Sequence, residues 1–250
     1  MKRFLNIVVV LMGLYAFAQN ETLFEEANAL YNEGQYAEAI DVYNEILNSG
    51  KHSAELYFNL GNAHYKLNNI APSIYFYEKA LQLSPNDEDV KNNLAFAQNM
   101  TIDDIDIIPE TGLARFLNAL THYLSFDNWA RMAVAFAVCF VLLFLIYYFA
   151  YSSFKKRLAF ISSMGSLMLC CITLALAFHK YNLEERDRPA IIFAAESKVK
   201  SEPNSRSEEL FRLHEGTKVQ LLDTINNWKK IKLSDGKTGW VVNNDVKALK

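Results

Sequence analysis

The sequence lacks the motifs by which many enzymes bind a phosphate, a metal ion or an acyl group. It contains no Gly-rich phosphate loop, no nucleophile elbow and no zinc-binding spacing. The histidines lie in unrelated segments, without ligand spacing around them: His52, His64, His122, His179 and His214. We therefore expect no catalytic residue, no metal and no cofactor, and a protein that is not an enzyme.

Asp103, Asp104 and Asp106 could be imagined as a metal cluster, but their spacing lacks the calcium-loop pattern. The acidic segment 101–110, which contains Pro109, is better interpreted as a solvated linker towards the membrane. The following segment, 113–124, has apolar residues at helical spacing. It could lie on the membrane surface or pack on the domain before it.

Cysteine is scarce as well. Cys139, Cys170 and Cys171 all lie in long apolar runs, which leaves no cysteine in the polar segments to form a disulfide. Charge is unevenly divided: residues 19–112 have sixteen acidic and four basic side chains, a local charge of −12, and residues 179–250 have fourteen basic and eleven acidic ones, a local charge of +3. Neither block has the concentrated basic face of a nucleic-acid-binding protein. The acidic block favours a basic or polar partner.

Apolar runs, in contrast, are long. Residues 1–18 have a basic start, a short apolar core and the ending Ala16-Phe17-Ala18. This pattern is typical of a secretory signal peptide, and the alternative is an uncleaved anchor helix. In both cases we expect the segment that follows to be exported.

Two further runs, Met132–Tyr151 and Leu158–Phe178, contain no charged residue over twenty and twenty-one positions. About twenty helical residues cross the roughly 30 Å hydrocarbon core of a bilayer. The loop expected between these runs carries Lys155, Lys156 and Arg157, and the positive-inside rule places such a loop in the cytoplasm. The sequence thus predicts a bacterial inner-membrane protein that crosses the membrane twice after signal cleavage, with both termini in the periplasm.

The exported N-terminal segment contains an internal repeat with a period of about 34 residues, which is typical of arrays of helix pairs. This offset aligns Ala27 with Gly61, Tyr31 with Tyr65, Ala39 with Ser73 and Tyr43 with Tyr77. The second copy closely resembles the tetratricopeptide family, whose pattern it matches at Tyr57, Leu60, Gly61, Tyr65, Ser73, Tyr77, Ala80 and Pro85. Small residues allow the two helices of a repeat to approach each other, and Pro85 ends the second helix. Residues 86–100 are interpreted as a capping helix.

By analogy with that family, the first helices of the repeats form a concave face. The residues expected on it are Phe24, Asn28 and Tyr31 in the first repeat and Phe58, Asn62 and Tyr65 in the second. Asparagine could bond the backbone of an extended peptide while the aromatic rings hold its side chains. In the alternative interpretation, Phe24 and Phe58 pack inside the array. Lysines that bind a carboxylate tail in some family members are absent from these positions.

The last segment changes to short strands separated by turn residues. Strand candidates are 190–194, 219–222, 228–233 and 237–242, the last two joined by the Ser234-Asp235-Gly236 turn. About sixty residues with five short strands, and the ending Gly239-Trp240-Val241, resemble the bacterial SH3 family. Trp228 and Trp240 could form an aromatic groove, although such tryptophans more often fill the core. The resemblance implies peptide or cell-wall ligands without establishing one.

The expected fold is a multi-domain α protein with a small β domain: a tetratricopeptide α-solenoid, a two-helix transmembrane hairpin and a C-terminal SH3-like β-barrel. The expected boundaries are 1–18 for the signal peptide, 19–100 for the repeats with their capping helix, 101–128 for the acidic linker and amphipathic segment, 129–178 for the transmembrane helices and their loop, and 179–250 for the SH3-like domain.

In domain order the chain resembles the BatE-type proteins of the Bat aerotolerance operon. That resemblance implies an inner-membrane scaffold for protein–protein interaction in an aerotolerance or stress complex. The implied partners are von Willebrand factor A-domain membrane proteins and a MoxR-type ATPase. The rival hypothesis is a cell-wall sensor whose SH3-like domain binds peptidoglycan. Partner-binding residues are expected at Phe24, Asn28, Tyr31, Phe58, Asn62, Tyr65, Trp228 and Trp240.

Overall fold

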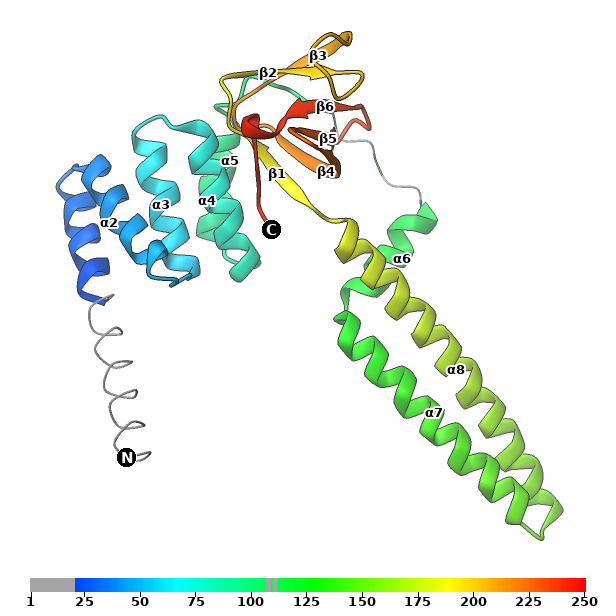
Figure 1. The fold of residues 1–250 in the computed structure, drawn as a ribbon. Coiled ribbons are helices and arrows are strands. Elements are labelled where there is room, and N and C mark those ends of the chain that lie inside the picture. Colours follow the sequence, from blue (N-terminus) through cyan, green and yellow to red (C-terminus); the bar gives the residue numbers. More distant parts are fainter. Residues whose placement is uncertain (1–20, 107–108, 110–111) are drawn as a thin grey trace, which may run out of the picture. The chain divides into compact units, whose positions relative to one another are not determined.

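The structure is a computed structural model that describes residues 21–106, 109 and 112–250. The chain divides into two compact units. One comprises Met1–Ile107 and Arg188–Lys250, and the other comprises Ile108–Asp187 (Figure 1). The expected signal peptide, residues 1–18, lies outside the described residues.

The first unit begins with a row of helices that pack side by side (Figure 1). They are residues 21–32, α2 (Tyr36–Asn48), α3 (Ala54–Lys66), α4 (Ile70–Leu83) and α5 (Glu88–Gln98). Residues 21–32 pair with α2 and α3 pairs with α4, so the chain forms two helical repeats. The turn within each repeat has a residue with positive φ, Gly34 at 82° and Asn68 at 60°. These two residues are separated by the same offset as the aligned sequence positions, which confirms the period seen in the sequence.

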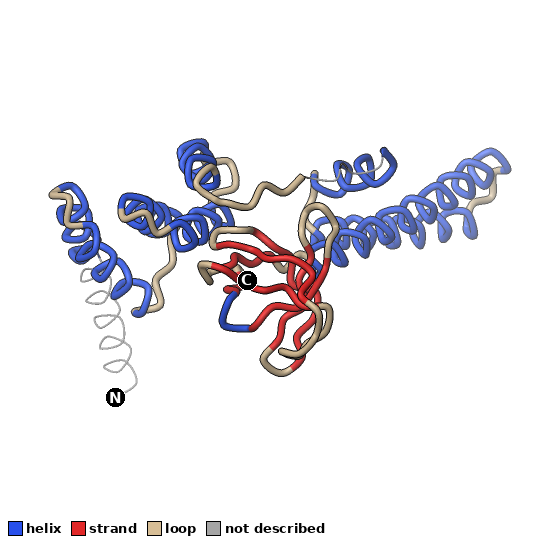
Figure 2. Tube along the Cα trace, turned by 90° about the horizontal axis from the view of Figure 1, so that it is seen from above, coloured by secondary structure: helices blue, strands red, loops and turns tan. Residues whose placement is uncertain are grey.

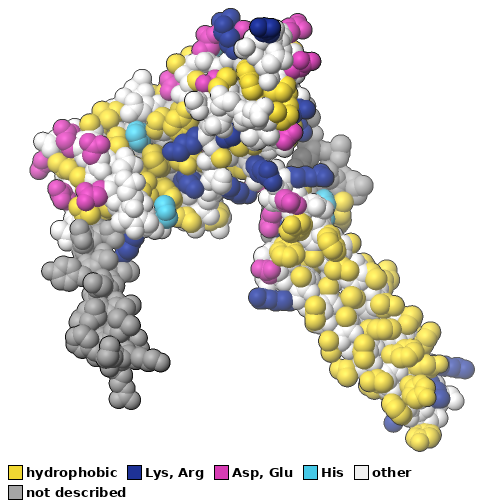
Figure 3. All heavy atoms as spheres, in the orientation of Figure 1, with side chains coloured by type: hydrophobic (Ala, Val, Ile, Leu, Met, Phe, Trp, Pro, Cys, Tyr) yellow, Lys and Arg dark blue, Asp and Glu magenta, His cyan; other side chains and the backbone are white. Residues whose placement is uncertain are grey.

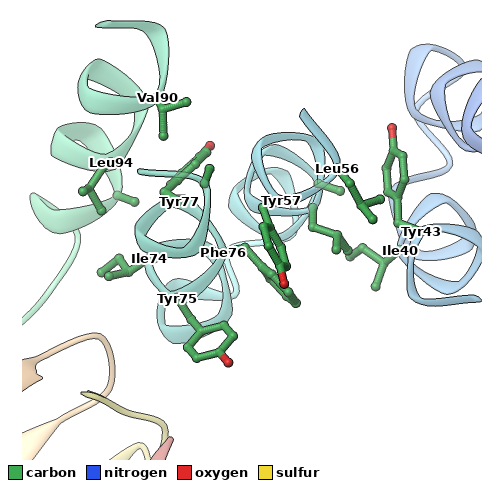
Figure 4. Packing of buried hydrophobic residues seen from close by; sticks show 14 of the residues in the cluster. Ile40, Tyr43, Leu56, Tyr57, Ile74, Tyr75, Phe76, Tyr77, Val90 and Leu94 are labelled. Atoms are coloured by element: carbon green, nitrogen blue, oxygen red, sulfur yellow. The ribbon is translucent and has the colours of Figure 1, made fainter. Parts of the chain in front are cut away.

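One hydrophobic core runs through both repeats and into α5 (Figure 4). Tyr43, Leu60, Ile74 and Tyr77 are among its fully buried side chains. The helices approach most closely at Gly61, where a Cβ atom would lie 2.6 Å from the Cδ1 and Cε1 atoms of Tyr77. The small residues identified in the sequence therefore have the packing role expected of them.

The C-terminal part of the first unit is a seven-stranded antiparallel sheet in the order β3-β2-β6-β5-β4-β1-β7 (Figure 2). Its strands are β1 (Pro189–Ile192), β2 (Glu196–Lys200), β3 (Glu209–His214), β4 (Lys218–Ile225), β5 (Trp228–Lys232), β6 (Thr238–Val242) and β7 (Val246–Ala248). The sheet surrounds a core of aliphatic side chains that includes Val199, Ile231 and Val241. Among the described strands the edges β3 and β7 are not paired, so the sheet is not closed into a barrel.

Three of these strands, β2, β3 and β7, were not among the strand candidates of the sequence. In β2 the exposed residues Glu196 and Lys198 alternate with the buried residues Ser197 and Val199. Only one apolar side chain of β2 therefore faces the core, which makes its hydrophobic alternation weak. The Ser197 hydroxyl donates to Asp245 Oδ2 at 2.7 Å, so the buried polar group has a partner.

The helical repeats and the sheet meet along a seam within the first unit. Asp103 Oδ2 accepts hydrogen bonds from the backbone N–H of His214 at 2.7 Å and the Thr217 hydroxyl at 2.6 Å. Asp103 Oδ1 lies 2.7 Å from His214 Nδ1. Burial raises the pKa of Asp103, but the hydrogen bonds from His214 and Thr217 outweigh it and hold this pKa below its usual value. The acidic segment expected to be a solvated linker is therefore fixed to the sheet at Asp103.

Apolar contacts continue the seam. Gly216 lies so close to α4 that a Cβ atom would be 2.9 Å from Ile74 Cδ1 and 3.0 Å from Ile70 Cγ2. The rings of Tyr75 and Phe193 meet edge to face, with centroids 5.6 Å apart. Because hydrogen bonds and packed side chains both join the two domains, we expect them to behave as one body.

The second unit contains α6 (Gly112–His122), α7 (Phe126–Phe149) and α8 (Ser153–Arg186). Two helices, α7 and α8, are long and apolar enough to cross a membrane. They pack against each other, and the Ser166 hydroxyl of α8 donates to the carbonyl oxygen of Phe136 in α7 at 2.8 Å. Their apolar side chains are largely exposed (Figure 3), as lipid-facing side chains would be.

Two local expectations change in this unit. The basic residues Lys155, Lys156 and Arg157 lie in the first turns of α8, because the connection from α7 is only 150–152. They were expected in the loop itself. The amphipathic segment 113–124 forms most of α6, and its Leu120 and Leu124 pack against Trp129, Leu176 and Ala177.

Candidate functional site

The same set of hydrogen bonds occurs in both helical repeats. Asn28 Oδ1 accepts from the Tyr43 hydroxyl at 2.5 Å and from Asn59 Nδ2 at 2.9 Å. Asn62 Oδ1 accepts from the Tyr77 hydroxyl at 2.7 Å and from Asn93 Nδ2 at 2.9 Å. Each member of the second set lies one repeat period after its counterpart in the first. We call these two sets the asparagine frames.

Burial keeps the phenols of the asparagine frames protonated. It raises the pKa of Tyr43 to about 12, with the hydrogen bond to Asn59 opposing the shift. It also raises the pKa of Tyr77 well above its ordinary value. A protonated phenol donates its hydrogen to the asparagine, which fixes the amide orientation. Because Oδ1 of each asparagine already accepts two hydrogen bonds, the amide offers a ligand its Nδ2 donor group.

A pocket of about 220 Å³ opens at the second frame. It is lined by Tyr31, Asn62, Tyr65, Lys66, Tyr77, Asn93 and Phe96. Tyr77 and Asn93 already donate to Asn62, so the donors that the pocket can offer a ligand are Asn62 Nδ2, the phenols of Tyr31 and Tyr65, and the Lys66 ammonium. Burial, followed by the nearby Tyr36, raises the pKa of Tyr31, which keeps this phenol protonated as well. The pocket therefore suits an extended segment that presents carbonyl or carboxylate oxygens. We call it the frame groove.

The structure brings together three of the six residues expected on the concave face, namely Tyr31, Asn62 and Tyr65. Phe24 lines a separate pocket with His52 and Leu56. Phe24 and Phe58 pack in equivalent ways, each with its ring centroid 6.0 Å from that of the tyrosine in its own frame. This arrangement agrees with the alternative interpretation, in which both phenylalanines pack within the array.

Four residues of the groove were not among the expected site residues, namely Lys66, Tyr77, Asn93 and Phe96; the sequence had identified Tyr77 only as a position of the repeat pattern. Asn93 could have been found, because it follows Asn59 at the same offset by which Asn62 follows Asn28. Phe96 is 59% exposed on the capping helix α5, where an apolar residue on the solvent side carries a signal for binding. Lys66 ends α3 and had no such signal.

Trp228 and Trp240 lie on the outer face of the sheet. Trp240 pairs with Lys230 of β5 and with Lys200 of β2, whereas Ile231 and Val241 point to the core face. Residues paired across antiparallel strands share a face, so Trp240 lies between two lysines. The Lys230 ammonium is 5.9 Å from the centroid of the Trp240 ring. Trp240 is nevertheless only 8% exposed, which leaves Trp228 as the more accessible ring.

Within the described residues, no three His, Cys, Asp or Glu side chains are grouped so that they could hold a metal ion. His214 and Asp103, which do lie together, belong to the seam between the repeats and the sheet.

Comparison with known families agrees with this architecture. A tetratricopeptide repeat model matches residues 24–88, which include both helix pairs. A bacterial SH3 domain model matches residues 195–247, which begin after β1. No curated protein matches the chain. The chain thus contains tetratricopeptide repeats and a bacterial SH3 domain, fused in one compact unit.

Proposed function

We propose that this protein is a membrane-anchored scaffold whose frame groove binds an extended segment of a partner protein. The observation that carries the proposal is the second asparagine frame, in which Asn62 is held by Tyr77 and Asn93 with its Nδ2 left to donate. A fixed amide donor between aromatic side chains can recognise a peptide backbone and hold a side chain beside it. The function is interaction rather than catalysis.

The membrane part of the proposal rests on α7 and α8. With the basic residues at the start of α8 in the cytoplasm, the repeats and the SH3 domain lie in the periplasm. In this arrangement the protein assembles an inner-membrane complex of the Bat/MoxR type. Its partners are von Willebrand factor A-domain membrane proteins, with a MoxR-type ATPase across the membrane.

The groove is tested by co-purification of the full chain from native membranes after cross-linking. The variants Lys66→Glu and Phe96→Ala change exposed residues that line the groove. A matched control is Leu83→Ala, since Leu83 is 53% exposed and does not line it. We expect the groove variants to lose the cross-linked partner and the control to keep it. Equal recovery of the partner with all three variants would contradict the proposal.

The orientation is tested separately by protease protection in spheroplasts, with one tag after Gln19 and one after Lys250. Digestion of both tags supports the periplasmic arrangement. Protection of either tag contradicts the proposed topology and leaves the groove experiment to be interpreted in the cytoplasm.

A second candidate function is a cell-wall sensor, favoured by the outer face of the SH3 domain. Trp228, Lys230 and Trp240 share this face, and aromatic rings beside lysines suit an anionic glycopeptide. Full-length protein with Trp228→Ala should then lose binding to purified sacculi while Phe96→Ala keeps it. If neither variant changes sacculus binding, the cell-wall function is contradicted.

A further inference from the structure

The short helix α6 packs beside one end of the pair formed by α7 and α8 (Figure 1). Leu120 of α6 packs against the apolar cluster that contains Trp129 of α7 and Leu176 of α8. Asn118 Oδ1 of α6 lies 3.2 Å from His179 Nε2 of α8. One apolar contact and one polar contact therefore hold the same side of α6 against the helix pair.

These contacts lie where the uncharged runs of α7 and α8 end. On α7 the run begins at Met132, directly after Arg131. On α8 it ends at Phe178, directly before His179 and Lys180. An uncharged run that crosses a bilayer ends at the boundary between the hydrocarbon and the headgroups. Because its partners lie within a turn of these ends, α6 lies at the level of this boundary.

A second side of α6 is apolar and exposed. Phe116 is 63% exposed, and Tyr123, in the turn that follows α6, is 83% exposed. Ala119 lies between them at helical spacing and is exposed as well. The apolar stripe of α6 is thus wider than the part that packs on the helix pair through Leu120, four positions after Phe116. We call Phe116, Ala119 and Tyr123 the aromatic face.

The helix pair has an apolar pocket at the same level. Its volume is about 240 Å³, and it is lined by Phe126, Ala130, Leu174, Ala177, Phe178 and Tyr181. Such a lining suits hydrocarbon, because a polar ligand would lose its hydrogen bonds to water there and gain few in return. At this boundary α7 and α8 therefore present apolar surface as well as α6.

We propose that the aromatic face binds the surface of a phospholipid bilayer, with Phe116 and Tyr123 inserted between the headgroups. The proposal rests on the membrane crossing of α7 and α8 proposed above, but not on the side of the membrane on which the repeats lie. Aromatic rings are favoured at this boundary. The ring of a tyrosine is apolar, and its hydroxyl can bond to headgroups or water.

The position of α6 identifies lipid as the occupant. Asn118 and Leu120 fix the helix at the end of the two spans, so the aromatic face continues the lipid-facing surface of α7 and α8. An amphipathic helix at this depth buries its apolar side about 5–10 Å into the boundary between headgroups and acyl chains. Insertion of α6 would then help to set the depth and tilt at which the helix pair crosses the membrane.

The test uses the full chain in vesicles of phosphatidylethanolamine and phosphatidylglycerol, with one nitroxide spin label at a time. Cys139, Cys170 and Cys171 are first replaced by alanine, so that only an introduced cysteine carries the label. The aromatic face is then labelled through Phe116→Cys, Ala119→Cys and Tyr123→Cys. All three positions are exposed, so the label displaces no buried side chain.

Two further labels provide the references. Val138→Cys is the hydrocarbon reference, because Val138 is 53% exposed within the uncharged run of α7. Glu185→Cys is the water reference, because Glu185 is exposed near the end of α8, beyond that boundary. Collisions of the label with oxygen, which concentrates in hydrocarbon, are compared with collisions with a water-soluble nickel chelate.

We expect the ratio of oxygen to nickel collisions on the aromatic face to be several-fold higher than at Glu185 and lower than at Val138. A ratio equal to that at Glu185 would overturn the proposal, since the face would then lie in water. Few collisions with either reagent would also overturn it, because protein would then cover the face. A label at Val138 that fails to report hydrocarbon would instead contradict the membrane crossing itself.

Discussion

The first and second repeats have the same internal frame but different outer surfaces. Asn28, Tyr43 and Asn59 repeat as Asn62, Tyr77 and Asn93, with nearly the same distances. On the outer side, the exposed Asp41 corresponds to Tyr75, which packs against the SH3 domain. The comparison shows that packing between helices constrains the frame, whereas the outer side of each repeat depends on what covers it.

The largest loss of stability should come from a change at the contact between the repeats and the SH3 domain. Only the second repeat forms this contact. Gly216 has φ of 86°, and a Cβ atom there would lie 2.8 Å from Thr101 Cγ2 and 2.9 Å from Ile74 Cδ1. Gly216→Ala should destabilise the first unit by about 2–4 kcal/mol, through backbone strain and overpacking. Gly50→Ala is the matched control, because Gly50 has φ of 84° with nothing within 4 Å. Its cost should be about 1–2 kcal/mol.

Thermal unfolding in detergent, followed by circular dichroism, measures both glycine variants. The midpoint should fall further for Gly216→Ala than for Gly50→Ala. Equal shifts would mean that the seam contributes nothing beyond the backbone conformation.

The next largest loss of stability should come from the asparagine frames, and comparing the two frames tests whether they are equivalent. Asn62→Ala would leave the buried Tyr77 hydroxyl without its acceptor, at a cost of about 1–3 kcal/mol. Asn28→Ala should cost a similar amount through Tyr43. Adding Tyr77→Phe to Asn62→Ala should recover part of the loss, because no unsatisfied hydroxyl remains. Denaturant unfolding of the three variants measures these costs, and a Tyr77→Phe change that deepens the loss would contradict this account of the frame.

A smaller loss of stability should appear at acidic pH, where the carboxylate of Asp103, which joins the repeats to the sheet, becomes protonated. The pKa of Asp103 is lowered in the folded protein, so the stability it contributes is present above the unfolded value of about 3.9 and is lost as pH falls through the folded pKa. Asp103→Asn should cost about 1–2 kcal/mol at neutral pH and should remove this acid-dependent loss. The exposed Asp104→Asn is the control, and its unfolding curves should match those of the wild type.

A second pH dependence of stability should come from His64 in the second repeat. Burial, followed by the charge of Lys247, lowers the pKa of His64 to about 4. The unfolded chain, with a pKa of about 6.5, binds the proton first, so stability should be constant above that pH and fall as pH decreases towards 4. The equivalent residue of the first repeat is Leu30. His64→Leu should therefore flatten the unfolding midpoint between pH 6.5 and 4, and an unchanged slope would exclude His64 as its source.

The sequence predicted the repeats well because their register depends on local spacing. Small residues at Ala27 and Gly61, the aromatic positions and the turn at Gly34 and Asn68 all recur after one period. The two apolar helices were equally visible, since length and the absence of charge are properties of the chain itself. The β5–β6 hairpin agreed with its Ser-Asp-Gly turn.

The functional surfaces were predicted less well because they depend on neighbours distant in sequence. Asn28 and Asn62 were expected to contact a ligand, but their oxygens are held by residues 15 and 31 positions further along the chain. Asp103 looked like a linker residue until its partner at position 214 was known. Periodicity reports which side chains share a face, and it does not report which partner a face will meet.

The sequence alone thus determined the period of the repeats, the length of the apolar helices and the uneven distribution of charge. These properties follow from residue spacing and composition, which depend only on residues close together in the sequence. Only the tertiary structure decided that the repeats and the SH3 domain share a seam, that Tyr31, Asn62 and Tyr65 line one groove with Phe96, and that Asn118 lies beside His179. Each of these depends on bringing together residues far apart in the chain, where side-chain packing and paired hydrogen bonds select the partners.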